Sequence, residues 1–270
     1  MNRIITALDF SDPEKARSLV KQLAPELTRL KIGNQLFTSA GPAFVEECQN
    51  AGFDVFLDLK YHDIPNTVAS ALSAAVSLGV WMVNVHASGG PEMLSAARDT
   101  VKQYDRAALS GGGTRVIAVT VLTSLDRADL SATGLDTEPS EQVARLARMT
   151  RQAGLDGVVC SPHEVGLIRS IAKNNFLTIT PGIRPDQSGN VPIGTISTHG
   201  GKPDDQRRTL TPFDAILAGS DYLVIGRPVT QADSPVSVLH ALQAEVQIAA
   251  AQAAKEQEMW QPAPVKTELN

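Results

Sequence analysis

The chain has 270 residues, of which 43% are hydrophobic and 20% are charged, with a formal net charge of −5. This composition is ordinary for a globular protein and lacks the basic surplus of nucleic-acid-binding domains, although a local patch could still bind a small anion. No apolar run approaches the roughly 18 residues of a membrane span, and no apolar leader follows the first methionine. Cys48 and Cys160 form no CxxC pattern, so we expect two reduced thiols. We therefore expect a soluble cytoplasmic protein that binds neither nucleic acid nor a membrane.

Strand-like and helix-like segments alternate along the chain. Apolar residues at every second position indicate strands, apolar residues three and four apart indicate helices, and proline or glycine marks many of the boundaries. The pattern predicts strands at 4–8, 30–32, 54–60, 80–86, 115–122, 157–160, 176–180 and 222–225. It predicts helices from residue 13, over 40–51 and 65–78, from residue 91, over 140–153, 162–173 and 212–218, and from residue 235 into the 250s.

Eight strands, each followed by a helix and without an intervening linker, predict a (β/α)₈ TIM barrel, an α/β fold in a single domain. We expect this catalytic domain to span residues 1–250. An open doubly wound sheet is the alternative, but the first turn, Leu8-Asp9-Phe10-Ser11-Asp12, lacks the GxGxxG motif of a dinucleotide site. The Ala-, Gln- and Glu-rich tail, 251–270, is expected to fray.

The predicted third strand ends in a dense set of reactive side chains. Alternate residues of a strand share a face, so Phe56, Asp58 and Lys60 are expected to point the same way. A carboxylate and an ammonium on one face would be costly in a plain core, but they fit the mouth of a barrel. Asp63 adds a second carboxylate, just before the helix that Pro65 opens.

In a TIM barrel the active site lies at the carboxyl ends of the strands, and polar residues gather at these ends here. One of them alone would mean little, because strand-end charges often form solvated salt bridges. The set comprises Asp9, Lys31, Asp58, Lys60, Thr123, Ser124, Arg184 and Arg227. Asn84 and His86 also face into the predicted barrel, but a core hydrogen bond explains them equally well, so we leave them out of the site. Trp81 and Val83, which alternate with them, are expected to face the helix layer.

Two glycine–arginine loops follow the predicted seventh and eighth strands, Pro181-Gly182-Ile183-Arg184 and Ile225-Gly226-Arg227-Pro228. Barrels often bind phosphate in these loops, because arginine presents a planar fork and glycine lets backbone N–H groups approach closely. A lone Gly-Arg-Pro is usually an ordinary turn, whereas the two loops together predict a phosphate site. The long segment 186–205, closed by Gln206-Arg207-Arg208, is predicted to be a mobile lid over the phosphate.

These motifs resemble those of the orotidine 5′-phosphate decarboxylase family, and the resemblance covers about residues 3–245. The matching motifs are Ala7-Leu8-Asp9, Lys31-Ile32-Gly33, Asp58-x-Lys60-x-x-Asp63, Ile64-Pro65-Asn66-Thr67, Val83-Asn84-Val85-His86-Ala87, the two arginine loops, and Asp205-Gln206-Arg207-Arg208. The DxKxxD core also occurs in other phosphate-binding barrel decarboxylases. The Ile-Pro-Asn-Thr extension and the arginine loops make the resemblance specific.

The resemblance implies decarboxylation of orotidine 5′-monophosphate to UMP and CO₂, the last step of pyrimidine synthesis, without a metal or a cofactor. It also implies a homodimer in which Asp63 and Thr67 reach into the partner's active site. Lys60 would protonate C6 of the pyrimidine, and Asp58 together with the partner's Asp63 would hold Lys60. Opposite charges nearby would keep Lys60 and Lys31 protonated.

The same resemblance assigns the substrate contacts. Asp9 and Lys31 would bind the ribose hydroxyls, and Thr123 and Ser124 would lie at the pyrimidine edge. The phosphate ligands would be Gln206, Gly226, Arg227 and Arg184. The segment between Arg184 and Gln206 is longer than the family pattern and carries an unfamiliar insert at 192–199, so the lid and its phosphate contacts depart from that pattern.

Two other functions remain possible from the sequence. A relative that decarboxylates a keto-sugar phosphate would use Mg²⁺ and a glutamate ligand where this chain has Lys31, and a lysine there would repel the metal. A non-catalytic nucleotide-binding barrel is the second hypothesis, because a fold alone does not determine function. Activity in EDTA and turnover of orotidine monophosphate distinguish them.

Overall fold

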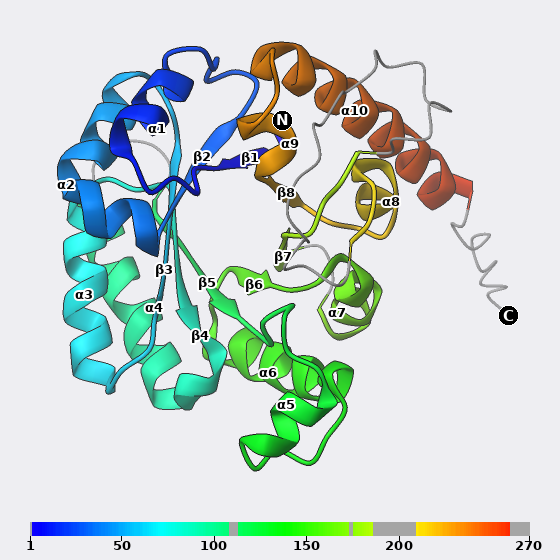
Figure 1. Ribbon diagram of the computed structural model, residues 1–270. Coiled ribbons are helices and arrows are strands. Elements are labelled where there is room, and N and C mark those ends of the chain that lie inside the picture. The colour runs from blue at the N-terminus through cyan, green and yellow to red at the C-terminus, as the bar shows by residue number, and fades with distance from the viewer. Residues whose placement is uncertain (1, 108–112, 173–174, 186–208, 260–270) are drawn as a thin grey trace, which may run out of the picture.

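The computed structural model describes residues 2–107, 113–172, 175–185 and 209–259. Eight parallel strands form a closed barrel in the order β1 to β8, and β8 pairs with β1 through Ile5 and Val224. Helices surround the strands (Figure 1). This closure confirms the predicted (β/α)₈ barrel and excludes the open doubly wound sheet.

The strands are three to seven residues long and lie close to their predicted positions. Their bounds are β1 Ile4–Ala7, β2 Arg29–Gly33, β3 Val55–Tyr61, β4 Met82–His86, β5 Arg115–Val119, β6 Gly157–Val159, β7 Leu177–Thr180 and β8 Tyr222–Ile225. The largest difference is in β5, which ends at Val119 and not at residue 122.

The helices include several that the sequence pattern did not predict. Their bounds are α1 Pro13–Val20, α2 Asn34–Asn50, α3 Pro65–Ser77, α4 Gly90–Ala107, α5 Arg127–Ala132, α6 Pro139–Ala153, α7 Val165–Ile171, α8 Pro212–Leu217, α9 Arg227–Thr230 and α10 Pro235–Met259, with 3₁₀ turns η1 Ala87–Gly89 and η2 Pro162–Glu164. The short helices α5 and α9 are additions. Helix α2 begins before its predicted start and is interrupted at Gly41, where φ is 66°.

Helix α10 continues to Met259, past the predicted end of the barrel domain at residue 250. Residues 260–270 of the predicted tail lie outside the described residues. None of the helices in the described segments is long and apolar enough to cross a membrane.

Alternation along the strands divides the core into two layers. Phe56 and Met82 belong to a cluster inside the barrel, whereas Leu57 and Val83 pack between the barrel and its helices. The prediction for Trp81 was wrong, because its ring packs against the interior cluster and not against the helix layer. The residue lies just before β4, at the amino-terminal opening of the barrel, where a large ring can cover the interior.

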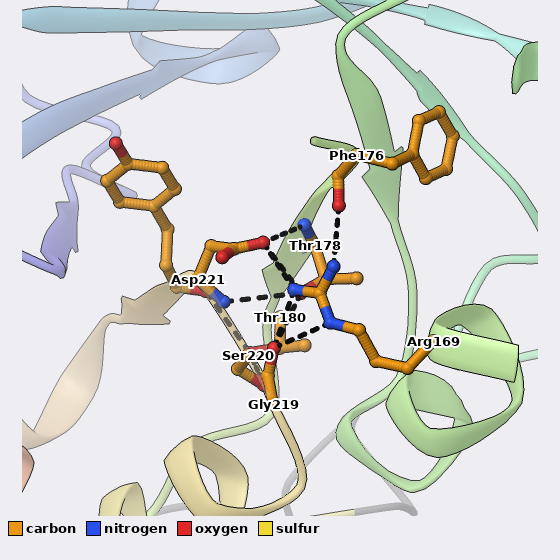
Figure 2. A network of polar contacts seen from close by, with 8 residues as sticks. Arg169, Phe176, Thr178, Thr180, Gly219, Ser220 and Asp221 are labelled. Carbon is orange, nitrogen blue, oxygen red and sulfur yellow. Dashed lines mark hydrogen bonds and ion pairs between the residues drawn. The ribbon is translucent and has the colours of Figure 1, made fainter. Parts of the chain in front are cut away.

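Side-chain carboxylates extend the strand pairing at the amino-terminal end of the barrel. Asp221, just before β8, accepts hydrogen bonds from the Thr178 backbone N–H at 2.8 Å and from the Arg169 guanidinium at 2.5 Å. Arg169 also donates to the carbonyls of Phe176 and Gly219, so it ties α7 to β7 and β8 (Figure 2). Asp156, before β6, accepts from the Val116 N–H of β5 in the same way, at 2.7 Å.

Substitution of Gly157 tests how closely β6 packs against β7. A Cβ atom built on this glycine would lie 2.2 Å from the carbonyl oxygen of Leu177, which is backbone and cannot move aside alone. We expect Gly157→Ala to lower the free energy of unfolding by about 1–3 kcal/mol, the usual cost of overpacking. Urea denaturation followed by circular dichroism measures the change.

Gly166→Ala is the matched control, since a Cβ at this exposed glycine of α7 meets nothing within 4 Å. It should raise stability by about 0.5 kcal/mol, because alanine is the better helix former. Equal effects of the two substitutions would contradict the packing argument.

Candidate functional site

Four charged side chains of alternating sign form a row across the carboxyl ends of β1, β2 and β3. The Lys31 ammonium lies 3.2 Å from Asp9 Oδ1 and 3.1 Å from Asp58 Oδ2. The Lys60 ammonium lies 2.7 Å from Asp58 Oδ1. Asp58 therefore joins two ammonium groups, one from each side, through its two carboxylate oxygens.

Two members of this row are buried. The side chains of Lys31 and Asp58 are 11% and 10% exposed. Burial alone would lower the pKa of Lys31, but the carboxylates of Asp58 and Asp9 outweigh it and raise that pKa. Burial would likewise raise the pKa of Asp58, but Lys31, Lys60 and the hydrogen bonds from Lys60 and Asn84 lower it. Lys31 and Asp58 are thus kept charged by their neighbours.

The backbone at Lys60 departs from a regular strand. Strands β3 and β4 pair Leu57 with Val83 and then Tyr61 with Val85, so three residues of β3 face Asn84 alone. Within this bulge Lys60 has a φ of 52°, the only positive φ at a non-glycine position in the described segments. Such a conformation costs of order 1 kcal/mol or more and is typical of functional sites.

Asn84 belongs to this site, although the sequence analysis left it out. Its side chain lies within hydrogen-bond distance of both Lys60 and Asp58, at 2.8 Å and 2.7 Å. The available signal was its alternation with Met82 on β4, which predicted correctly that it faces the barrel interior.

The charged row forms part of the wall of a cavity of about 580 Å³ at the carboxyl ends of the strands. Apolar residues such as Phe56 and Ile179 line its deeper part, and Arg184 and Arg227 follow β7 and β8 on its wall. The lining residues are Ala7, Asp9, Lys31, Phe56, Asp58, Lys60, Val119, Val121, Leu122, Thr123, Val159, Cys160, Ile179, Pro181, Arg184, Val224, Gly226, Arg227 and Gln231. A small polar molecule of nucleotide size fits such a volume.

Most of the predicted site residues meet in this cavity. Those that line it are Asp9, Lys31, Asp58, Lys60, Thr123, Arg184, Gly226 and Arg227. Ser124 is exposed and does not line the cavity, because β5 ends early and the chain turns outward there. Gln231, which does line it, was not predicted; no motif in the sequence singled it out.

Asp63 and Thr67 are exposed on the surface and do not line the cavity of their own chain. Asp63 Oδ1 accepts a hydrogen bond from the N–H of the next residue, Ile64, at 2.7 Å. Ile64 itself is 67% exposed, which is unusual for an isoleucine. The side chains of Asp63, Ile64 and Thr67 therefore face outward from this chain.

The described residues that flank the predicted lid pair with each other beside Arg184. The Arg184 N–H donates to the Leu210 carbonyl at 3.0 Å, and the Leu210 N–H donates to the Gly182 carbonyl at 3.2 Å. Gln206 and the whole of 186–205 lie outside the described residues. Among the residues that the structure does describe, no group of three or more His, Cys, Asp or Glu side chains could hold a metal ion.

Comparison with known proteins gives strong similarities over most of the chain. Residues 2–242 match the family described as "Orotidine 5'-phosphate decarboxylase / HUMPS family". The chain is 55% identical over 238 residues to the orotidine 5′-phosphate decarboxylase of Tolumonas auensis, which covers 88% of this chain and 95% of that protein. It is 50% identical to the enzyme of that name from Haemophilus influenzae, over 91% of this chain and 99% of the other.

A solved structure agrees with these sequence matches. The crystal structure of orotidine 5′-phosphate decarboxylase from Lactobacillus acidophilus is 33% identical and superimposes with a TM-score of 0.75, covering 91% of this chain and 99% of that one. The similarities therefore span every strand of the barrel and the whole charged row.

Asp58→Asn tests the electrostatics of the row. Asp58 has a lowered pKa in the folded state, so its contribution to stability is present above about pH 4 and is lost as the pH falls through that folded pKa. Lys31 has a raised pKa, so its contribution is present below about pH 10 and is lost as the pH rises through its folded pKa. In Asp58→Asn, burial would dominate at Lys31 and lower its pKa. Stability should fall by roughly 3–5 kcal/mol at pH 7, as for other broken buried pairs, and part of the loss should be regained between about pH 8 and 10.

Asp54→Asn is the matched control. Asp54 pairs with Arg29 at 3.0 Å, but its side chain is 54% exposed, so the loss should stay below about 1 kcal/mol. Urea denaturation of the three proteins across this pH range provides the measurement. A loss in Asp58→Asn that does not change with pH would contradict the role given to Lys31.

Proposed function

Since the chain belongs to the orotidine 5′-phosphate decarboxylase / HUMPS family, we propose that it converts orotidine 5′-monophosphate into UMP and CO₂. The observation that carries this proposal is the Asp9–Lys31–Asp58–Lys60 row in a cavity with Arg184 and Arg227 on its wall. In an eight-stranded ring β7 lies across from β3, so Arg184 and Lys60 are separated by the width of the cavity, and Arg227 follows the neighbouring strand β8. A nucleotide can span that width, with phosphate at one side and base at the other.

The proposed decarboxylation requires a positive charge that is held in a fixed position. When the bond between C6 and the carboxylate breaks, CO₂ leaves and the electron pair stays on C6 in the plane of the ring, where the π system does not delocalise it. An ammonium held at that position stabilises the developing charge, and then donates a proton to form the C6–H bond of UMP. Lys60 supplies the ammonium and the proton, and solvent restores the proton after release of UMP.

Asp58 and Lys31 hold this arrangement in place. Asp58 accepts from Lys60 with one oxygen and pairs with Lys31 through the other, which fixes the direction of both lysines. Lys31 and Asp9 lie at the wall near β1 and β2, and they bind the ribose hydroxyls in our proposal. Because these groups are held before substrate arrives, little reorganisation is needed during the reaction.

The remaining contacts are divided between base and phosphate. Thr123 lines the cavity after β5 and contacts the pyrimidine edge in our proposal, and Ser124 joins it only if this turn moves inward. Arg184, Gly226 and Arg227 bind the phosphate together with Gln206. Binding energy at the phosphate, which is far from C6, can be used to position the base for reaction.

We infer that the working form is a homodimer. Asp63 and Thr67 are exposed in the single chain, and Asp63 turns toward its own backbone and not toward Lys60. A second copy placed against this surface would cover Ile64 and bring the partner's Asp63 to the charged row. We place the protein in the cytoplasm, where Cys48 and Cys160, both free and buried, stay reduced.

The family description also names HUMPS. The alternative function is an Mg²⁺-dependent reaction on a keto-sugar phosphate. Lys31 argues against it. Its ammonium lies between Asp9 and Asp58, where it occupies carboxylates that a cation would need and repels the cation.

The first test measures loss of orotidine 5′-monophosphate absorbance in EDTA buffer. We expect turnover by the wild-type protein, and a fall of at least about 10⁴-fold in kcat for Lys60→Ala with UMP binding retained, because this change removes both the charge and the proton donor. Lys15→Ala, at an exposed position of α1, is the control and should behave as wild type.

The other outcomes are equally informative. UMP binding by wild type without turnover would indicate a nucleotide-binding barrel that is not an enzyme. Turnover of a keto-sugar phosphate with Mg²⁺, in place of turnover in EDTA, would establish the alternative reaction.

The dimer is tested by mixing two inactive variants, Lys60→Ala and Asp63→Ala. If the partner's Asp63 completes each site, a mixed dimer contains one site in which Lys60 and Asp63 are both intact. Unfolding and refolding an equimolar mixture should restore about a quarter of wild-type activity, since random pairing makes half of the dimers mixed. Activity that stays at the level of the separate variants would contradict a shared site.

A further inference from the structure

Asn84 lies beneath the charged row and makes two hydrogen bonds to it. The residue belongs to β4, is fully buried, and does not line the cavity. Its Oδ1 accepts from the backbone N–H of Lys60 at 2.8 Å, and its Nδ2 donates to Asp58 Oδ1 at 2.7 Å. These two neighbours fix the orientation of the amide, because the flipped amide would set donor against donor and acceptor against acceptor.

The bulge in β3 explains why a side chain is needed at this place. Three residues of β3 face Asn84 between the paired positions Leu57–Val83 and Tyr61–Val85. A bulge removes regular ladder partners, and a buried N–H without a partner is costly. The Asn84 amide oxygen supplies the partner for Lys60, whose backbone is left-handed at φ 52°.

We propose that Asn84 is a positioning residue for the reacting lysine, which it directs by holding the bulged backbone of Lys60 and the carboxylate of Asp58 at the same time. The ammonium of Lys60 is thereby kept 2.7 Å from Asp58 Oδ1 on the wall of the cavity. This inference rests on the proposed decarboxylation. It extends that proposal to a residue that does not touch the substrate cavity.

An amide of this length is required for both contacts. Aspartate can accept from Lys60 but has no proton to donate to Asp58 when ionised, and alanine can do neither. Asp58 Oδ1 receives hydrogen bonds from both Asn84 and Lys60, so loss of the first leaves the carboxylate held only by the flexible side chains of Lys60 and Lys31. A displacement of about 1 Å at a reacting group is enough to reduce a rate about 100-fold.

The first experiment separates kcat from binding in Asn84→Asp and Asn84→Ala. We expect kcat on orotidine 5′-monophosphate to fall at least about 100-fold in Asn84→Ala, and in Asn84→Asp at pH values where the new aspartate is ionised, while the Kd for UMP changes less than about threefold, since Asn84 does not line the cavity. Thr6→Val is the matched control. Thr6 is also fully buried, and its hydroxyl bonds Thr28 at 2.8 Å in the barrel wall, so this variant should lose stability and keep kcat.

The pH dependence of kcat/KM distinguishes a positioning role from a loss of stability, because a loss of stability alone does not shift it. In Asn84→Asp a second carboxylate faces Asp58, which is otherwise surrounded by Lys31 of β2, Lys60 of β3 and His86 of β4, with Asp9 beyond Lys31. Two carboxylates this close share a proton, so the acid limb of kcat/KM should move up by at least about one pH unit. Asn84→Ala adds no carboxylate and should show a smaller shift.

Two results would overturn the positioning role. One is a folded Asn84 variant whose kcat stays within about threefold of wild type. The other is a crystal structure of Asn84→Ala in which Lys60 keeps both its left-handed backbone and its contact with Asp58. If Asn84→Ala does not fold, kcat and the crystal structure are both determined for the isosteric Asn84→Asp. Absence of turnover by wild type would refute the proposed function instead, and the crystal structure would then decide the positioning role alone.

Discussion

The carboxylate of Asp58 is the group on which the rest of the site depends. It is 10% exposed and lies between the ammonium groups of Lys31 and Lys60, at 3.1 Å and 2.7 Å. A buried lysine without a counter-ion would lose its proton, and a buried aspartate without a cation would gain one. The charges of Lys31 and Asp58 therefore persist because their partners are present. The ends of β2, β3 and β4 are joined through this one side chain, since Asn84 also donates to it.

The two ends of the barrel perform different tasks. At the amino-terminal end, Asp156 and Asp221 pair with backbone N–H groups of the preceding strands, and Arg29 stacks over Trp81 at 4.4 Å. These contacts satisfy the local donors and close the interior. At the carboxyl end the charged side chains instead line the cavity, and the backbone of Lys60 is strained. Stability supplied at one end offsets the cost of holding reactive groups at the other, as is general for barrels that place chemistry at the carboxyl ends of their strands.

The regular part of this structure could be predicted from the sequence, and the irregular part could not. Strand number, barrel closure and the inward direction of Asp58 follow from alternation and from the repeated strand–helix pattern. The bulge at Lys60 does not, because a period of two assumes a regular strand and the bulge depends on pairing with β4. For the same reason Asn84 seemed an ordinary core residue, since its two partners are defined only once β3 bends.

Other differences have local causes. The early end of β5 turns Ser124 away from the cavity, and nothing in the alternating run 115–122 marks that end. Helix α5 did leave a signal, because Asp126 and Asp129 form a reciprocal capping box that the sequence analysis overlooked. Trp81 broke the alternation rule because the rule applies within a strand, and Trp81 lies just outside β4.

The bulge also explains how catalysis and assembly are linked in the proposed dimer. Lys60 and Asp63 are three residues apart in sequence, yet Lys60 lines the cavity and Asp63 is exposed. The left-handed backbone at Lys60 redirects the chain, and Pro65 opens α3 soon afterwards, so the intervening residues are too few to bring Asp63 back to its own site. In the proposed dimer this carboxylate is supplied by the partner subunit. An exposed Ile64 beside it supplies apolar surface for that contact. The bend that directs Lys60 inward thus also directs Asp63 and Ile64 outward, and dissociation of the proposed dimer would remove a charge from the row and expose an apolar side chain in one step.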